Sequence, residues 1–229
     1  MRATAILTTR LERELAAYAV AAGAAGVGIL ALSQPADAKI IYTSAHKNIS
    51  RGQTYRLDVN HDGTADFTFH NEFQTTDTGG SSWLSVRPVG SNAVRGFVDH
   101  YGIGWADALK LDARIGPKKT FIEQAARMVF IGVGSSGTVT LGRWINVRKR
   151  YLGLRFKIHG ETHYGWARLN VSHPLPFVIS ARLTGYAYET NPDKPIVAGD
   201  MGPTGESLGH LALGAADREQ KRQNLVAGH

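Results

Sequence analysis

The segment from Arg150 to Val171 reads RYLGLRFKIHGETHYGWARLNV and contains two runs in which apolar and polar residues alternate. In the first run, residues 152–158, Leu, Leu, Phe and Ile occupy every second position between Gly, Arg and Lys. Alternation with a period of two predicts a β-strand with one buried face. The return run, 163–171, alternates in the same way, and the intervening His-Gly-Glu-Thr suits a two-residue turn with glycine first. The segment therefore predicts an antiparallel hairpin.

Shorter runs of the same kind predict further strands around residues 55–59, 67–69, 83–87, 139–145 and 178–189. One stretch differs from them. Thr120 and Glu123 have the spacing of a capping box, and the apolar residues that follow recur at helical intervals. Many short strands separated by turn residues favour an all-β fold, an antiparallel β-sandwich or jelly roll. We therefore expect this fold with one short helix.

The first 38 residues have the layout of a secretory signal. Three arginines lie before residue 15, Ala16–Leu32 carries no charge, and Ala36-Asp37-Ala38 offers a cleavage site. We expect a cleavable signal helix over 1–38, the β-domain over 39–196 and a flexible or short-helical tail over 197–229. An uncleaved membrane anchor is the alternative at the first end, and a sorting tail is the alternative at the second. Cleavage places the protein in the periplasm, at the cell surface or outside the cell, without a stable membrane span.

The composition sets limits on the chemistry of the protein. Hydrophobic residues make up 43% of the chain, which is enough for a core. The chain has no cysteine, so zinc–thiolate sites, thiol nucleophiles and disulfides are excluded. A net charge of +7 favours anionic partners such as an acidic polysaccharide or another envelope component. No nucleic-acid-binding module is recognisable, and we therefore expect no nucleic-acid partner.

The strongest chemical signal is the stretch DVNHDGTADF, residues 58–67. Oxygen donors with the spacing of a calcium loop come from the side chains of Asp58, Asn60, Asp62 and Asp66 and from the carbonyl of Thr64. Glycine at the sixth position permits a sharp turn. The twelfth position is a phenylalanine rather than the glutamate of an EF-hand, so a shorter calcium loop between two strands is predicted. The alternative is a hairpin turn rich in Asp and Asn that binds nothing.

A basic and aromatic stretch is the second candidate site, comprising Trp144, Arg148, Lys149, Arg150 and Tyr151. Guanidinium and ammonium groups interleaved with aromatic rings suit an anionic glycan. The alternative is a solvated turn followed by the outer face of a strand.

Histidines near the central turn form a third candidate. His159, Glu161 and His163 could bind a metal or transfer protons, although such residues are more often solvated turn positions. The sequence contains no GxSxG elbow, phosphate loop or HExxH motif, so we assign no catalytic residue.

Three stretches resemble a known group of proteins: RYLGLRFKIHGETHYGWARLNV (150–171), LTGYAYETNPDKPIVAG (183–199) and SLGHLALGAA (207–216). They are similar to uncharacterised exported proteins, best represented in acidobacteria, that resemble PEP-CTERM-type secreted proteins. The leader RLERELAAYAVAAGAA (10–25) is similar as well. The resemblance implies export, a β-sandwich and association with extracellular polysaccharide, and it brings no catalytic residue.

These observations support two functional hypotheses. The first is an exported, non-enzymatic, calcium-stabilised β-sandwich that binds a glycan of the cell envelope or extracellular matrix. The alternative is a carbohydrate-active enzyme, a hydrolase or lyase, on a jelly-roll scaffold.

Overall fold

The structure is a computed structural model that describes residues 39–175 and 177–202, and within these residues it is entirely β, with no helix. The expected signal helix and most of the expected tail lie outside the described residues. The strands are β1 Ile40–Ile49, β2 Thr54–Leu57, β3 Phe67–Thr76, β4 Gly79–Pro88, β5 Ala93–Val98, β6 Gly104–Ala106, β7 Arg114–Ile115, β8 Phe121–Ile122, β9 Ala126–Gly134, β10 Gly137–Leu141, β11 Val147–Ile158, β12 Glu161–Leu175, β13 Val178–Glu189 and β14 Ile196–Val197.

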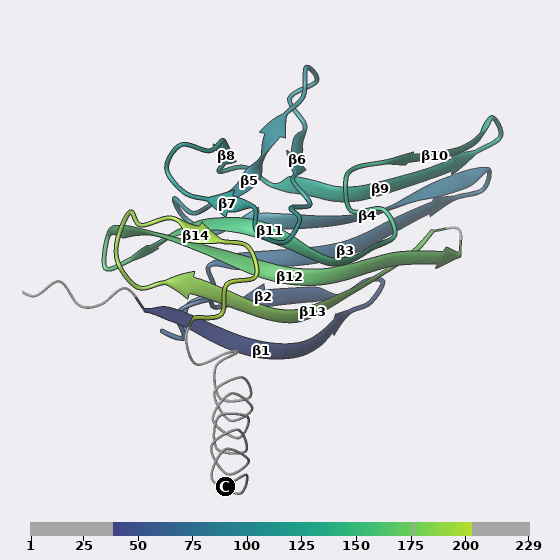
Figure 1. The fold of residues 1–229 in the computed structure, drawn as a ribbon. Helices are drawn as coiled ribbons and strands as arrows, with labels where there is room; N and C mark the ends of the chain where they lie inside the picture. Colours follow the sequence, from purple (N-terminus) through teal and green to yellow (C-terminus); the bar gives the residue numbers. More distant parts are fainter. Residues whose placement is uncertain (1–38, 176, 203–229) are drawn as a thin grey trace, which may run out of the picture. The chain divides into compact units, whose positions relative to one another are not determined.

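Twelve of these strands belong to one sheet (Figure 1). Its order is β1-β13-β12-β11-β5-β6-β9-β4-β3-β2, with β10 added beside β9 and β8 beside β5. The pairing is antiparallel throughout except between β6 and β9, which run parallel. β7 and β14 form a separate two-stranded sheet.

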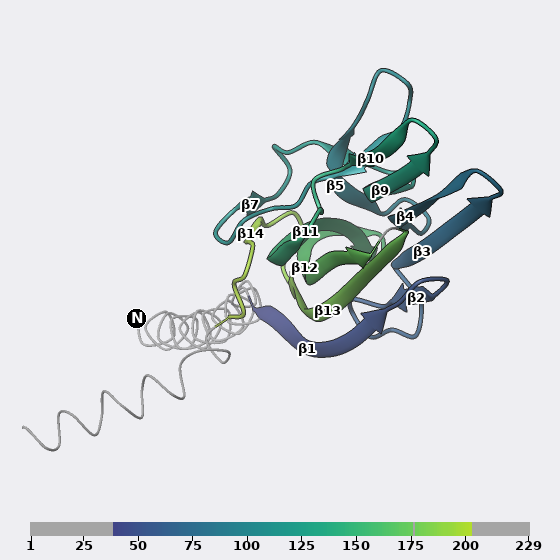
Figure 2. The ribbon, with the colours of Figure 1, turned by 90° about the vertical axis from the view of Figure 1, so that its right-hand side faces the viewer.

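The long sheet curls, so that its two ends, β1 and β2, come close together (Figure 2). Strands of both halves therefore share one buried cluster. Phe67 on β3 and Leu84 on β4 belong to this cluster, and so do Leu154 on β11 and Leu183 on β13. The side chain of Asn71 crosses the core and donates hydrogen bonds to the carbonyls of Ile49 (2.9 Å) and Ile179 (2.8 Å). A buried polar group thus connects β3 of one half to the other half.

The central hairpin is confirmed. β11 and β12 pair antiparallel from Arg150–Leu169 to Ile158–Glu161. The turn consists of His159 and Gly160, whose φ angles are both positive, 49° and 87°. Two positive φ angles define a type I′ turn, in which glycine is the second residue rather than the first as the sequence indicated.

The predicted helix near residues 120–129 is wrong, because this stretch contains β8 (Phe121–Ile122) and the beginning of β9, which starts at Ala126. β9 pairs with β4, and the register shifts at Met128, so that Met128 and Val129 are both buried. This bulge breaks the period of two, and the resulting spacing of apolar residues imitates a helix. Glu123 does not cap a helix but forms an ion pair with Arg155, at 2.7 Å.

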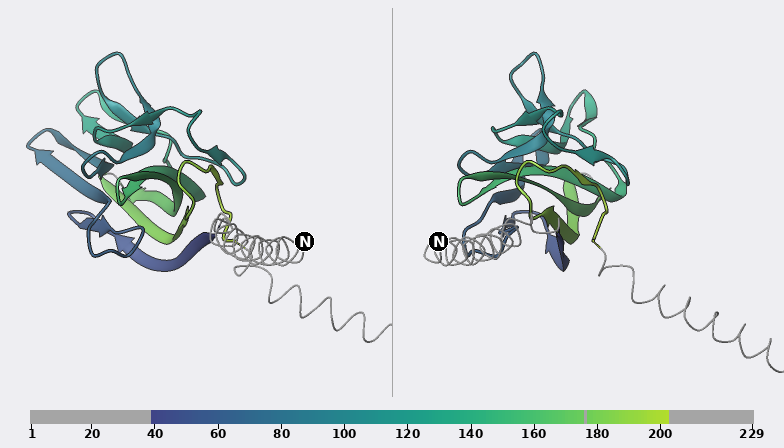
Figure 3. Two further views of the ribbon diagram at one scale, coloured as in Figure 1. Left: turned by 90° about the vertical axis from the view of Figure 1, so that its left-hand side faces the viewer. Right: turned by 60° about the vertical axis from the view of Figure 1, so that its left-hand side comes forward.

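The outer face of β11–β12–β13, opposite the shared core, has two contrasting halves. At one end a second buried cluster includes Tyr151, Trp166 and Ile196, and the segment containing β14 covers it (Figure 3). Residues 197–202, assigned from the sequence to the tail, contact this end, where Trp166 Nε1 donates to the carbonyl of Asp200 (3.0 Å). At the other end, the outward row of β12 continues with two polar residues, Asn170, which is half-buried, and Ser172, which is exposed.

Candidate functional site

The loop between β2 and β3 is held in shape by its own aspartates. Gly63 N–H donates to Asp58 Oδ2 (2.8 Å), and Asp62 N–H donates to Asp58 Oδ1 (3.3 Å). Thr64 N–H donates to Asp62 Oδ1 (2.8 Å). His61 and Gly63 have positive φ angles of 62° and 89°, which let the backbone wrap around the carboxylates. The side chains of Asp58 and Asp62 therefore accept hydrogen bonds from the backbone of their own loop.

Asp66 faces the interior of the fold rather than the loop. It is 7% exposed, and its Oδ2 accepts a hydrogen bond from Val59 N–H (2.8 Å). Asn92 Nδ2 donates to Asp66 Oδ1 (3.2 Å). Burial, helped by the nearby carboxylates of Asp58 and Asp62, raises the pKa of Asp66 to about 6, although the hydrogen bonds from Val59 and Asn92 act in the opposite direction. The carboxylates of Asp58 and Asp62 therefore disfavour the ionised form of Asp66.

The side-chain oxygen of Asn60 is the feature of the loop that lacks a protein partner. Asn60 Nδ2 donates to Asp62 Oδ2 (2.9 Å), and this hydrogen bond lowers the pKa of Asp62. Asn60 Oδ1, in contrast, is buried and has no hydrogen-bond partner among the described residues. Buried oxygen atoms are normally satisfied, and a cation would satisfy this one.

The described part of the chain holds no group of three His, Cys, Asp or Glu side chains arranged around a common point for a metal. In the Asp58 loop, Asp66 is turned away and the oxygens of Asp58 accept backbone amides. A cation here would be held by Asp58, Asn60 and Asp62 with the carbonyl of Thr64, while Asp66 supports the loop from inside.

The basic and aromatic stretch is divided by the fold. Trp144 is fully buried, outside any strand, and its Nε1 donates to the carbonyl of Ala106 (3.2 Å). Tyr151 is 4% exposed and packs edge-on against Trp166, with 5.2 Å between ring centroids. Neither ring is available for stacking on a ligand. Arg150 is half-buried, whereas Arg148 and Lys149 are exposed.

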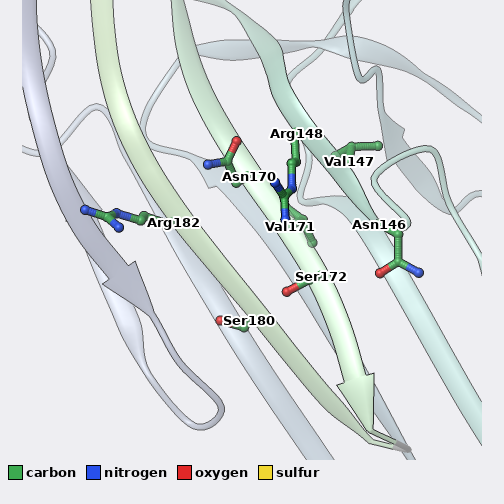
Figure 4. Close-up of a pocket in the computed structure, with 8 residues that line it drawn as sticks. All are labelled: Asn146, Val147, Arg148, Asn170, Val171, Ser172, Ser180 and Arg182. Atoms are coloured by element: carbon green, nitrogen blue, oxygen red, sulfur yellow. The ribbon is translucent and has the colours of Figure 1, made fainter.

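Arg148 lies at a groove on the polar half of the outer face described above. The groove has a volume of about 400 Å³. It is lined by Asn146, Val147, Arg148, Asn170, Val171, Ser172, Ser180 and Arg182. Arg148 extends from β11 over β12, and Arg182 extends from β13 towards β1 (Figure 4). Because the two arginines start from strands that are two spacings apart, about 10 Å, they form a cationic band across the sheet rather than a single point.

Within the described part of the chain, no carboxylate neutralises the charges of this groove. No carboxylate of residues 39–175 or 177–202 lies within ion-pairing distance of Arg148 or Arg182. By comparison, Arg143 and Arg155, which do not line the groove, pair with Asp107 and Glu123, each at 2.7 Å. The groove therefore presents positive charge together with amide and hydroxyl groups.

The backbone beside the groove is strained. Asn146 and Lys149 have φ angles of 48° and 50°, although neither is glycine. Lys149 N–H donates to Asn170 Oδ1 (2.8 Å), and His173 N–H donates to Asn146 Oδ1 (3.1 Å). These bonds fix both amide side chains. Left-handed conformations of this kind are concentrated at functional sites, where they position side chains.

The histidines of the central turn do not form a site. His163 is buried, 4% exposed, and its Nδ1 lies 3.0 Å from the carbonyl oxygen of Glu189. His159 is exposed at the turn itself. The two side chains therefore lie in different environments and do not face each other across the turn.

Sequence reasoning missed Arg182 and the polar residues of β12 and β13 that complete the groove. Ser180 and Arg182 occupy alternate positions of β13, opposite Ser172 and Asn170 of β12. The alternation of polar residues was visible in the sequence. The pairing register that brings them beside Arg148 was not.

No family model matches the chain, and neither the curated proteins nor the solved structures include a significant match. The resemblance to exported acidobacterial proteins therefore stays a prediction. Among the residues that the structure describes, no helix is both long enough and apolar enough to cross a membrane.

Proposed function

We propose that this protein is an exported, non-enzymatic β-sandwich that binds an anionic polysaccharide of the cell envelope or extracellular matrix, and that calcium stabilises it. The curled sheet, whose two halves share one buried core, supports the sandwich part of this proposal. The observation that carries the proposal is the outer-face groove with Arg148 and Arg182, neither of which pairs with a carboxylate of residues 39–175 or 177–202.

The composition of the groove suits a polymeric anion. Guanidinium groups bind carboxylates and sulfates through paired donors, and the amides and hydroxyls between them can bond to sugar hydroxyl groups. Because the arginines lie on different strands, they match charges that repeat along a chain better than a single small anion. The lining contains no acidic side chain and no histidine, so it offers the groups of a binding site rather than those of acid–base catalysis.

Calcium has a structural role in this proposal. The Asp58 loop joins β2 to β3, and its residue His61 contacts the other half of the sheet, with Nε2 3.0 Å from Thr43 Oγ1. Tyr186 on β13 also lies against His61, with 5.8 Å between ring centroids. A cation that fixes this loop therefore stabilises the closure of the curled sheet as well as the β2–β3 hairpin.

A glycan array with the mature chain, residues 39–229, tests the binding function. We expect binding to uronate-containing or sulfated glycans, and loss of that binding in the R148Q/R182Q variant. The matched control is Arg56→Gln, because Arg56 is an exposed arginine on β2 that does not line the groove and forms no ion pair with a carboxylate of the described residues. Absence of anionic glycans among the bound probes, or equal binding by R148Q/R182Q, would overturn the proposal.

A further inference from the structure

A second surface, on the outer side of β3, β4, β9 and β10, belongs to the opposite half of the sheet. The pairing register aligns four side chains across it. Glu72 is opposite Trp83, Trp83 is opposite Phe130, and Phe130 is opposite Leu141. Directly opposed residues on neighbouring strands point to the same face, so they form one continuous row. We call this row, with the hollows beside it, the Trp83 surface.

Three adjoining hollows follow this row. The first, of about 400 Å³, is lined by Glu72, Trp83, Arg87 and Arg127 among others. The second, of about 370 Å³, shares Glu72 and Trp83 and adds Gln74. The third, of about 510 Å³, shares Gln74 and continues past Phe130 to β10. An extended ligand in these hollows would therefore contact Glu72, Trp83 and Phe130.

Trp83 is the tryptophan that remains accessible. Of the four tryptophans in the chain, Trp105 is 8% exposed and Trp144 and Trp166 are fully buried, whereas Trp83 is half-buried. Its Nε1 donates to Glu72 Oε2 at 2.6 Å, a charge-assisted hydrogen bond that holds the indole in place. A ring fixed in advance loses little conformational entropy when a ligand stacks on it.

The rest of the row combines apolar surface with polar donors. Leu141 and Val139 are 46% and 51% exposed, and the Arg127 guanidinium lies 5.2 Å from the Phe130 ring centroid. Glu72 lines the same hollow as Arg87 and Arg127, so this surface carries charges of both signs, unlike the groove, whose lining has no carboxylate. Flat apolar surface bordered by carboxylate, amide and guanidinium groups complements one chemical class, pyranose sugars, whose C–H faces are apolar and whose edges carry hydroxyl groups.

We propose that the Trp83 surface is a second binding site that takes an extended, neutral polysaccharide chain, with a sugar ring stacked on Trp83. The inference does not depend on the arginine groove. It assigns the two halves of the curled sheet to two ligand chemistries, an anionic chain on β11–β13 and a neutral chain on β3, β4, β9 and β10. Simultaneous contact with both would make the protein a cross-linker of two polymers.

The test is titration of the mature chain with neutral hexasaccharides of β-1,4-linked glucose, xylose, mannose and N-acetylglucosamine. The tryptophan emission should shift with saturation for at least one sugar, because Trp83 is the accessible fluorophore. Calorimetry should give the same affinity, and Trp83→Ala should weaken it by roughly tenfold or more, as expected for a central aromatic contact.

Two further variants keep the test decisive. Glu72→Gln removes the charge that holds the indole and should weaken binding while the fold is retained, as judged by circular dichroism. R148Q/R182Q should bind the neutral sugar as well as the unmutated protein does, which separates this site from the groove. Absence of binding by all four sugars at concentrations up to about 5 mM, or unchanged binding by Trp83→Ala, would overturn the inference.

Discussion

Asp66 should make the stability of the domain depend on pH in an unusual direction. Its pKa in the folded protein is about 6, raised from an ordinary value of 3.8 mainly by burial. The folded state therefore holds a proton at pH values where the unfolded chain has released it. This difference stabilises the fold fully below about pH 4, and the stabilisation is lost as the pH rises through 6.

The size of the effect follows from the pKa difference. About two pKa units correspond to roughly 3 kcal/mol of unfolding free energy. For a domain of this size, that amounts to a fall of roughly 6–12 °C in melting temperature between about pH 4 and pH 7. Other groups titrate in the same pH range. The quantity to compare is therefore the difference in melting temperature between the unmutated protein and Asp66→Asn, in which the side chain at position 66 cannot titrate.

The assay is thermal unfolding followed by circular dichroism at several pH values, with chelator present. Relative to Asp66→Asn, the unmutated protein should become progressively less stable as the pH rises from 4 to 7. Parallel pH profiles for the two proteins would refute the argument, because they would show that Asp66 has the same pKa in the folded and unfolded states.

Calcium should offset the loss of stability at pH 7 by placing positive charge beside the carboxylates of the loop. At a concentration 100 times its dissociation constant, calcium should add about 2.7 kcal/mol to the unfolding free energy at pH 7. Magnesium should add less, because it dehydrates reluctantly and demands stricter octahedral geometry. Asp62→Ala should abolish the response, and identical melting curves in chelator and calcium would show that the loop is only a turn.

Two further predictions concern the core and the N-terminus. Asn71→Ala should lower the unfolding free energy by about 2–4 kcal/mol, because it removes hydrogen bonds to two buried carbonyls, those of Ile49 and Ile179, and denaturant titration measures this loss. A loss of unfolding free energy no larger than that caused by typical surface substitutions would mean that Asn71 does not connect the two halves of the sheet. Mass spectrometry of the secreted protein should find Lys39 as the first residue, and recovery of the intact chain from membranes would contradict cleavage after Ala38.

Strands with uninterrupted alternation could be predicted from the sequence. The central hairpin formed as expected, and β13 begins and ends at the predicted residues, Val178 and Glu189. Bulges account for the main failures. The bulge at Met128 made a strand resemble a helix, and β1, which was not predicted, contains a register shift between Ser44 and Lys47. A bulge inserts one extra residue into one strand of a pair and so interrupts the period of two. Its position depends on the pairing with a strand that is distant in the sequence, so the local pattern does not reveal it.

The candidate sites show the same division between local and long-range information. The Asp58 loop is local: Asp58 and Asp62 accept hydrogen bonds from amides of the loop itself, whereas Asp66 is buried. The groove is long-range, since Arg148, Asn170 and Arg182 come from three strands and meet only through pairing register. The sequence placed Trp144 in a surface patch because it lies close to basic residues along the chain. Its position in the sequence would be the same if it faced solvent or the core, and the structure shows that it is buried. Side-chain identity alone could not separate these cases.

The most direct test of the central claim is calorimetric titration with a short anionic sugar chain, such as a hexagalacturonate, at two salt concentrations. The unmutated protein and Arg56→Gln should bind alike, and R148Q/R182Q should bind at least about tenfold more weakly with an unchanged melting temperature. Raising the salt from about 50 to 200 mM should weaken binding by the unmutated protein far more than the residual binding of R148Q/R182Q. Equal affinity and equal salt dependence in all three proteins would contradict the assignment of the groove as the binding site.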